Sequence, residues 1–231
     1  MFFKFTFRKF LTHPYELAEQ LKSSTMRGFK VRLLLVFLAG LFLYGARELW
    51  GMSTESITPV LSTMSTADYT LARFASLISS LLWAVIYMSF YIFGFAYILA
   101  IITSIPFKKL LPLQVLMMGI LLIEKLIVFV VFVMQGAATN VSFLSFGPLA
   151  ATFLEIPFFI FFFNKLTVMT AIIIALQFKF ILSYTGFTKH KKLLWTLIII
   201  HVFMAVVTAS VGLIPMENLF ELLTGRGAGN A

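Results

Sequence analysis

The sequence predicts an all-α integral membrane protein, a bundle of five transmembrane helices preceded by a cytoplasmic amphipathic helix. Hydrophobic residues make up 61% of the 231 residues, and the mean hydropathy is +1.00. Charged residues make up only 12%, against about 25% in ordinary soluble domains. Long uncharged runs alternate with short basic clusters, as transmembrane helices alternate with loops. A water-soluble fold could not cover this much apolar surface, because its exterior needs polar groups.

The charge and cysteine content exclude several classes of protein. The chain carries 18 Lys and Arg residues against 9 Asp and Glu residues, a formal net charge of +9. These basic residues stand at the ends of apolar runs and form no stripe between stacking aromatic residues, so we expect no nucleic-acid partner. The sequence contains no cysteine, which excludes disulfides, thiolate metal sites and a cysteine nucleophile.

Residues 1–32 are predicted to form a basic cytoplasmic segment that contains the amphipathic helix. Pro14 suits the first turn of this helix, and Gly28 is expected to end it. The candidates for a membrane-surface anchor are phenylalanine and basic residues, namely Phe3, Lys4, Phe7, Arg8, Lys9 and Phe10. The alternative is a solvated basic tail. The segment lacks the apolar core of a cleavable signal peptide, so the first long apolar run is expected to remain as a span.

The membrane domain is predicted over residues 33–214. Its five spans are expected at about 33–52, 77–105, 113–134, 156–178 and 193–214, near the roughly 20 residues that a bilayer requires. At the end of the first span, Arg47 and Glu48 are expected to reach the outer surface. Residues 53–73 and 135–149 are predicted to be exterior loops.

The placement of basic residues predicts the orientation. With five spans, the cytoplasmic parts hold thirteen basic residues and the exterior parts hold three, which is the positive-inside bias. Four or six spans would place the basic cluster at 108–109 or the one at 189–192 outside. We therefore expect a multi-pass protein of the cell membrane with a cytoplasmic N-terminus, and with residues 215–231 as a short exterior tail.

Glu124, Lys125 and Lys165 are charged residues inside predicted spans, where charge is costly. The third and fourth spans are antiparallel, and a rise of about 1.5 Å per residue places Glu124 and Lys165 roughly 14–15 Å below the exterior surface. An ion pair between them is therefore expected. Lys125 points to another face of its helix and needs water or Glu155. The pair either locks two helices together, which we favour, or belongs to a polar relay or substrate path.

His201 lies inside the fifth predicted span. It is expected to hydrogen-bond a neighbouring helix, and the alternative is a place in a proton path. With Glu124, Lys125 and Lys165 it completes a candidate intramembrane polar network.

Motifs for common enzyme chemistry are missing from the sequence. It contains no phosphate-binding loop, so we expect no nucleotide binding by this chain. It contains no HExxH motif and no GxSxG elbow, and its three histidines are far apart. We therefore expect neither an enzyme, nor a cofactor, nor a metal site.

The layout resembles the Yip family of Ypt/Rab-interacting membrane proteins, and in particular its bacterial branch. The resemblance rests on a Pro-x6-Leu-Lys segment from Pro14 to Lys22 that leads to five helices, and on an apolar-Gly-apolar turn at 178–188 before the last span. The chain lacks the long acidic or Pro-rich cytoplasmic domain of many eukaryotic relatives. The resemblance implies an accessory subunit that accompanies an ABC-type efflux complex, with an ATPase and a permease as partners, and that protects the cell against a peptide toxin.

Three functions follow as alternatives. The first is a non-catalytic partner of a membrane transporter. The second is a transporter in its own right that uses Glu124, Lys125, Lys165 and His201. The third is a lipid-interacting or membrane-shaping protein that acts through the N-terminal phenylalanine and basic residues.

Overall fold

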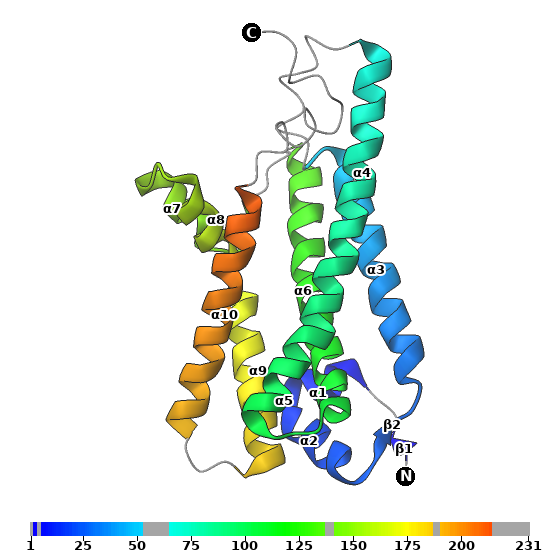
Figure 1. Cartoon of the computed structure of the whole chain (residues 1–231), viewed down its shortest axis with the longest axis vertical. Helices are drawn as coiled ribbons and strands as arrows, with labels where there is room; N and C mark the ends of the chain where they lie inside the picture. Colours follow the sequence, from blue (N-terminus) through cyan, green and yellow to red (C-terminus); the bar gives the residue numbers. More distant parts are fainter. Residues whose placement is uncertain (1, 4–5, 53–64, 137–140, 187–189, 214–231) are drawn as a thin grey trace.

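A computed structural model describes residues 2–3, 6–52, 65–136, 141–186 and 190–213 of the chain. Five helices in this part are long and apolar enough to cross a membrane, as the sequence predicts. They are α3 (Phe29–Trp50), α4 (Thr66–Ser89) continued through the π-helical turn η2 (Phe90–Gly94) into α5 (Phe95–Thr103), α6 (Phe107–Gln135), α9 (Val168–Thr185) and α10 (His190–Gly212). All five run along the long axis of the molecule (Figure 1).

Two helices begin earlier than the sequence predicts. The helix α4 starts at Thr66, so residues 66–73 are helical and do not belong to a loop. The helix α6 starts at Phe107, six residues before the predicted start of its span, and it contains Pro112. A proline this close to a helix start removes one backbone hydrogen bond, and the helix continues through it.

The fourth predicted span, 156–178, is wrong in its position. Residues 157–165 form a separate short helix α8 (Pro157–Lys165), and the spanning helix α9 starts only at Val168. Thr167 lies between them in an extended conformation and caps α9, because its hydroxyl accepts a hydrogen bond from the Thr170 N–H at 3.1 Å. The break therefore replaces helical hydrogen bonds with side-chain ones.

Contacts from a distant loop hold this break in place. Ser145 forms an isolated antiparallel bridge with Thr167. The amide oxygen of Asn164 accepts hydrogen bonds from the Ser142 N–H at 2.8 Å and from the Ser145 hydroxyl at 2.9 Å. A second short helix, α7 (Gly147–Phe153), follows this loop and packs against α8. The α7–α8 hairpin lies beside α10, away from the N-terminal end of the molecule (Figure 1).

The N-terminal segment folds onto the bundle as four short elements. They are β1 (Phe2–Phe3), α1 (Phe7–Thr12), α2 (Pro14–Ser23) and β2 (Thr25–Met26), with β1 parallel to β2. Pro14 begins α2, as the sequence predicts. Gly28 does not end that helix, because α2 ends at Ser23, and Gly28 instead precedes α3 with φ +70°.

The apolar face of the N-terminal segment is covered by protein. Phe10, Leu17 and Leu21 belong to the main hydrophobic core, and α2 packs closely against α9. A methyl group at Gly119 of α6 would lie 3.0 Å from the Phe7 ring, so this ring contacts the α6 backbone directly. We conclude that the segment fits between α6 and α9 at one end of the bundle (Figure 1).

Polar contacts complete this attachment. The ammonium group of Lys109 donates to the Ser24 carbonyl at 2.9 Å. The Glu19 carboxylate accepts from Lys22 at 2.8 Å and from Ser183 of α9 at 3.3 Å. The hydrogen bond from Lys22 lowers the pKa of Glu19, so this carboxylate remains charged into more acidic solution than an isolated glutamate.

The core of the bundle is centred on α6, whose buried residues include a long run from Leu113 to Met118. Gln114 in this run is fully buried, and its amide oxygen accepts from Gln177 of α9 at 3.4 Å. A methyl group at Gly40 of α3 would overlap the Met88 sulfur of α4, so this glycine permits a close approach of the two helices.

Candidate functional site

A polar cluster lies in the half of the bundle opposite the N-terminal segment. Arg47 lies 18 residues after the start of α3, Lys125 lies 18 residues after the start of α6, and Thr167 lies 18 residues before the end of α9. At a rise of about 1.5 Å per residue, each is about 27 Å from the helix end beside the N-terminal segment. The three positions therefore lie at the same distance along their helices.

The carboxylate of Glu124 is the acidic member of this cluster. It is buried, and its Oε2 atom accepts a hydrogen bond from the Thr167 hydroxyl at 2.8 Å. The same hydroxyl also caps α9, and it lies 3.2 Å from the hydroxyl of Thr170. Thr167 thereby joins α6 to the start of α9, and this contact depends on the helix break.

The predicted ion pair between Glu124 and Lys165 does not form. No nitrogen–oxygen distance of 4.0 Å or less joins the two side chains, and both ion pairs of the described residues lie in the N-terminal segment. The reason is the helix break, because Lys165 is the last residue of α8 and its side chain is exposed. The two groups still interact electrostatically over a longer distance.

Two lysines interact electrostatically with this carboxylate, and both also interact with Arg47. Lys125 interacts electrostatically with Arg47, Lys165 and Glu124, and Lys165 interacts with Arg47 and Glu124. Glu124 is the one carboxylate among the described residues with which the two lysines interact in this way. The cluster therefore holds more positive than negative charge.

Arg47 contacts its own helix, and the neighbouring Glu48 joins α3 to α4. Its guanidinium group lies 6.0 Å from the centre of the Tyr44 ring, and its Nε atom is buried without a hydrogen-bond partner. The next residue, Glu48, is 2% exposed and accepts a hydrogen bond from the Ser76 hydroxyl of α4 at 2.5 Å. Arg73 of α4 donates to the Glu48 carbonyl at 3.4 Å.

His201 lies apart from these groups. Its Nδ1 atom lies 2.9 Å from the carbonyl of Leu197 in the same helix, so Nδ1 carries the proton and Nε2 is buried without a partner. Its ring packs against Phe95 of α5 at 5.0 Å. The expected hydrogen bond to a neighbouring helix is thus replaced by ring packing.

Aromatic rings fill the space between His201 and the cluster. Tyr87 contacts Tyr91 at 6.1 Å between ring centres, and Tyr91 stacks on Phe95 at 5.7 Å. Both tyrosines interact electrostatically with Glu124. Phe95 can neither donate nor accept a conventional hydrogen bond, so this route from Glu124 to His201 is interrupted. The four residues of the predicted polar network therefore form a group of three and a separate histidine.

An apolar groove runs between α3 and α6. It has a volume of about 430 Å³ and is lined by apolar residues of both helices, namely Leu35, Val36, Ala39, Phe42, Leu43, Gly119, Leu122, Ile123 and Leu126. Two small residues line the groove, Ala39 of α3 and Gly119 of α6, and the Phe7 ring already lies against Gly119. Ala39 therefore leaves room for the backbone of another helix to approach closely.

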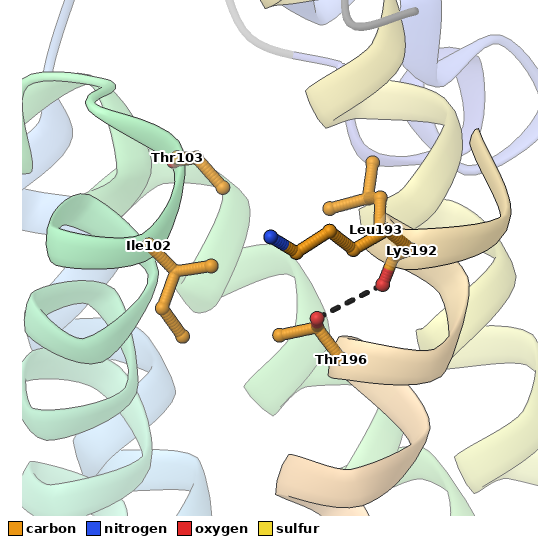
Figure 2. Close-up of a pocket in the computed structure, with 5 residues that line it drawn as sticks. All are labelled: Ile102, Thr103, Lys192, Leu193 and Thr196. Atoms are coloured by element: carbon orange, nitrogen blue, oxygen red, sulfur yellow. Dashed lines mark hydrogen bonds between the residues drawn. The ribbon is translucent and has the colours of Figure 1, made fainter. Parts of the chain in front are cut away.

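A smaller pocket of about 130 Å³ lies between the end of α5 and the start of α10. Figure 2 shows that the Lys192 side chain extends across it toward Ile102 and Thr103, while the Thr196 hydroxyl donates to the Lys192 carbonyl at 2.9 Å. The Thr103 hydroxyl donates a hydrogen bond to the Leu99 carbonyl at 2.6 Å. One exposed lysine therefore provides the charge of this pocket.

The predicted surface anchor is partly enclosed by the fold. Phe10 is 1% exposed and Phe7 contacts Gly119, so neither ring is free to enter lipid in this arrangement. Phe3 packs edge-on against Phe10 at 6.0 Å between ring centres. Arg8 and Lys9 are exposed, and Lys9 pairs with Glu16 at 2.5 Å. Lys4 lies outside the described residues.

Sequence reasoning missed two members of the cluster. Thr167 was hidden inside a predicted continuous span, although Asn164, Lys165 and Thr167 together are an unusual density of polar residues for such a span. Arg47 was assigned only to the outer surface. The match between its distance along α3 and that of Lys125 along α6 appears only with the helix starts at Phe29 and Phe107, which the sequence did not predict.

The remaining features are metal binding by the described residues and similarity of the whole sequence to known proteins. Within the described residues, no group of three or more histidine or acidic side chains is placed to hold a metal ion. Comparison of the chain with protein-family models, with curated proteins and with solved structures finds no match. The Yip resemblance stays a prediction that rests on its two sequence motifs.

Proposed function

We propose that this chain is a multi-pass protein of the cell membrane and a non-catalytic accessory subunit of an ABC-type efflux transporter. The N-terminus is placed in the cytoplasm by the positive-inside bias. Membrane insertion is supported by five long apolar helices whose outward side chains are largely apolar. Phe42, for example, is 80% exposed, which lipid accommodates and water does not.

The groove between α3 and α6 is the observation that carries the accessory role. Lipid removes the hydrophobic drive for helices to associate, so close packing at small residues supplies much of the contact energy. The groove combines the small residue Ala39 with larger apolar residues on both sides, and the protein itself covers little of α3. We infer that a transmembrane helix of the transporter occupies it. The ABC-type identity of the partner, and a role against a peptide toxin, come from the Yip resemblance.

The test is co-purification from native membranes in a mild detergent. A transporter ATPase and permease are expected in amounts nearly equal to this chain. Ala39→Trp fills the groove and is expected to remove both subunits while the chain stays monodisperse. Ala175→Trp, on an exposed face of α9, is the matched control and should leave them bound. The proposal fails if neither subunit accompanies the wild-type chain, or if both tryptophan variants behave alike.

The charged group of Glu124, Lys125 and Lys165 favours a second candidate, transport by this chain alone. Charged residues inside spans often mark a substrate or ion path. The interruption at Phe95 argues against a continuous proton route to His201. Purified protein in vesicles that moves a solute without other subunits, and loses this activity in Glu124→Gln, would favour this candidate over the first.

The third candidate, membrane shaping by the N-terminal segment, is less well supported. Its phenylalanine residues at positions 7 and 10 already contact the bundle. Deleting residues 1–30 would therefore be expected to destabilise the bundle end between α6 and α9.

A further inference from the structure

We propose that Arg47, Lys125 and Lys165 form a binding site for the phosphate group of an anionic lipid, at the membrane surface opposite the N-terminal segment. None of the three residues lines the α3–α6 groove, although Lys125 adjoins the groove residue Leu126, so the two proposals are tested by different substitutions. Its assignment to the outer leaflet rests on the orientation given under the proposed function.

The position of the three residues fits the level of lipid phosphates. Arg47 and Lys125 each lie about 27 Å from the cytoplasmic ends of their helices, by a rise of about 1.5 Å per residue. The hydrocarbon core of a bilayer is about 30 Å thick. Their ammonium and guanidinium groups can therefore extend into the far headgroup layer, as long basic side chains commonly do.

The charge balance of the site calls for an anion. The two lysines interact with each other, with Arg47 and with the Glu124 carboxylate, and Arg47 interacts with the Glu48 carboxylate. The site thus holds three positive and two negative groups. None of the three basic groups has a carboxylate within 4.0 Å among the described residues. Like charges at the edge of a low-dielectric region repel strongly unless a counter-ion lies between them. Glu124 is directed to Thr167 instead, so it neutralises them only in part.

The three basic residues of the site differ in exposure. Lys165 is exposed, and Lys125 and Arg47 are half-buried. The Nε atom of Arg47 is buried and lacks a hydrogen-bond partner. A planar guanidinium group and two flexible ammonium groups suit the several oxygens of a phosphate. Because the Lys165 side chain is exposed, we expect a lipid to approach the site from this side.

The experiment is native mass spectrometry of the full chain in detergent, titrated with phosphatidylglycerol, with phosphatidylcholine or with inorganic phosphate. We expect phosphatidylglycerol to bind more tightly than phosphatidylcholine. Arg47→Gln, Lys125→Gln and Lys165→Gln are each expected to weaken phosphatidylglycerol binding roughly fivefold, at about 1 kcal/mol per basic residue near a membrane surface. Lys179→Gln, at an exposed position of α9 near its other end, is the matched control and should change nothing.

Two further arms separate the outcomes. Glu124→Gln removes the competing negative charge and is expected to strengthen phosphatidylglycerol binding. Competition by millimolar inorganic phosphate would support the phosphate chemistry and identify a soluble phosphate as the source. Because Lys165 is exposed, Lys165→Gln keeps the fold and tests the site even if Arg47→Gln aggregates. Equal binding of the two lipids, or equal loss in Lys165→Gln and Lys179→Gln, would overturn the proposal.

Discussion

Among single residues, Thr167 has two structural roles at the start of α9. Its hydroxyl caps α9 and donates to the buried carboxylate of Glu124. Glu124 therefore obtains a hydrogen bond without a salt bridge, which lowers the cost of burying it. A threonine in this position is a structural residue that also orients the acidic member of the polar cluster.

Replacing Thr167 with valine is expected to destabilise the protein. The substitution keeps the shape but removes a helix cap, at about 1 kcal/mol, and leaves the Glu124 carboxylate without its partner, at about 1–3 kcal/mol. Thermal or denaturant unfolding in detergent measures the loss. Thr167→Ser keeps the hydroxyl and should remain near the wild-type stability.

Thr152→Val is the matched control for this prediction. Thr152 is an exposed threonine whose hydroxyl donates only to the Leu149 carbonyl of its own helix. Its substitution is expected to be nearly neutral. A stability loss in Thr152→Val equal to that in Thr167→Val would show that the contact with Glu124 contributes little.

At the scale of elements, the N-terminal segment is an integral part of the bundle. Its helices α1 and α2 present phenylalanine and leucine side chains to α6 and α9, and its charged residues pair with one another outside. Amphipathicity in the sequence indicated one apolar face. It did not distinguish whether lipid or protein covers that face.

Phe10→Ala is expected to loosen this segment. Truncating a buried phenylalanine lowers the free energy of unfolding by about 3–5 kcal/mol. This loss is enough to loosen short helices such as α1 and α2. Hydrogen exchange should then increase over residues 14–23 while α6 remains protected. Tyr15→Ala is the control, because Tyr15 is 49% exposed. Unchanged exchange in Phe10→Ala would mean that Phe10 does not anchor α1 and α2 to the bundle.

At the scale of the whole molecule, the five long helices and their apolar exterior indicate a membrane as the solvent. The α7–α8 hairpin adds an apolar surface beside α10, and Glu155 is exposed at the turn of this hairpin. A charged turn favours the membrane surface over its interior. We therefore expect the hairpin to lie at a membrane surface.

Single cysteine variants test membrane insertion and orientation directly, because the chain has no cysteine of its own. In sealed vesicles of known orientation, a membrane-impermeant thiol reagent should label Lys108→Cys only from the cytoplasmic side and Glu155→Cys only from the other side. Phe42→Cys should resist the reagent although it is 80% exposed, since lipid covers it. Labelling of Lys108→Cys and Glu155→Cys from one side, or ready labelling of Phe42→Cys, would contradict the layout.

The helical class and the number of long apolar helices could be predicted from the amino-acid sequence. These depend on local composition, because each stretch carries its own hydrophobicity whatever lies beside it. The sequence also indicated the start of α2 at Pro14 and the importance of Glu124 and Lys125 as charges within an apolar helix.

The start of the fourth long helix and the contacts within the polar cluster depend on the folded arrangement of the chain. The break before α9 depends on Ser142 and Ser145, which are about twenty residues from Asn164 and Thr167 and contact them only after folding. The same break turned Lys165 away from an ion pair and gave Glu124 a hydroxyl partner. Side-chain pairing is a through-space property, and hydropathy along the chain carries no information about it.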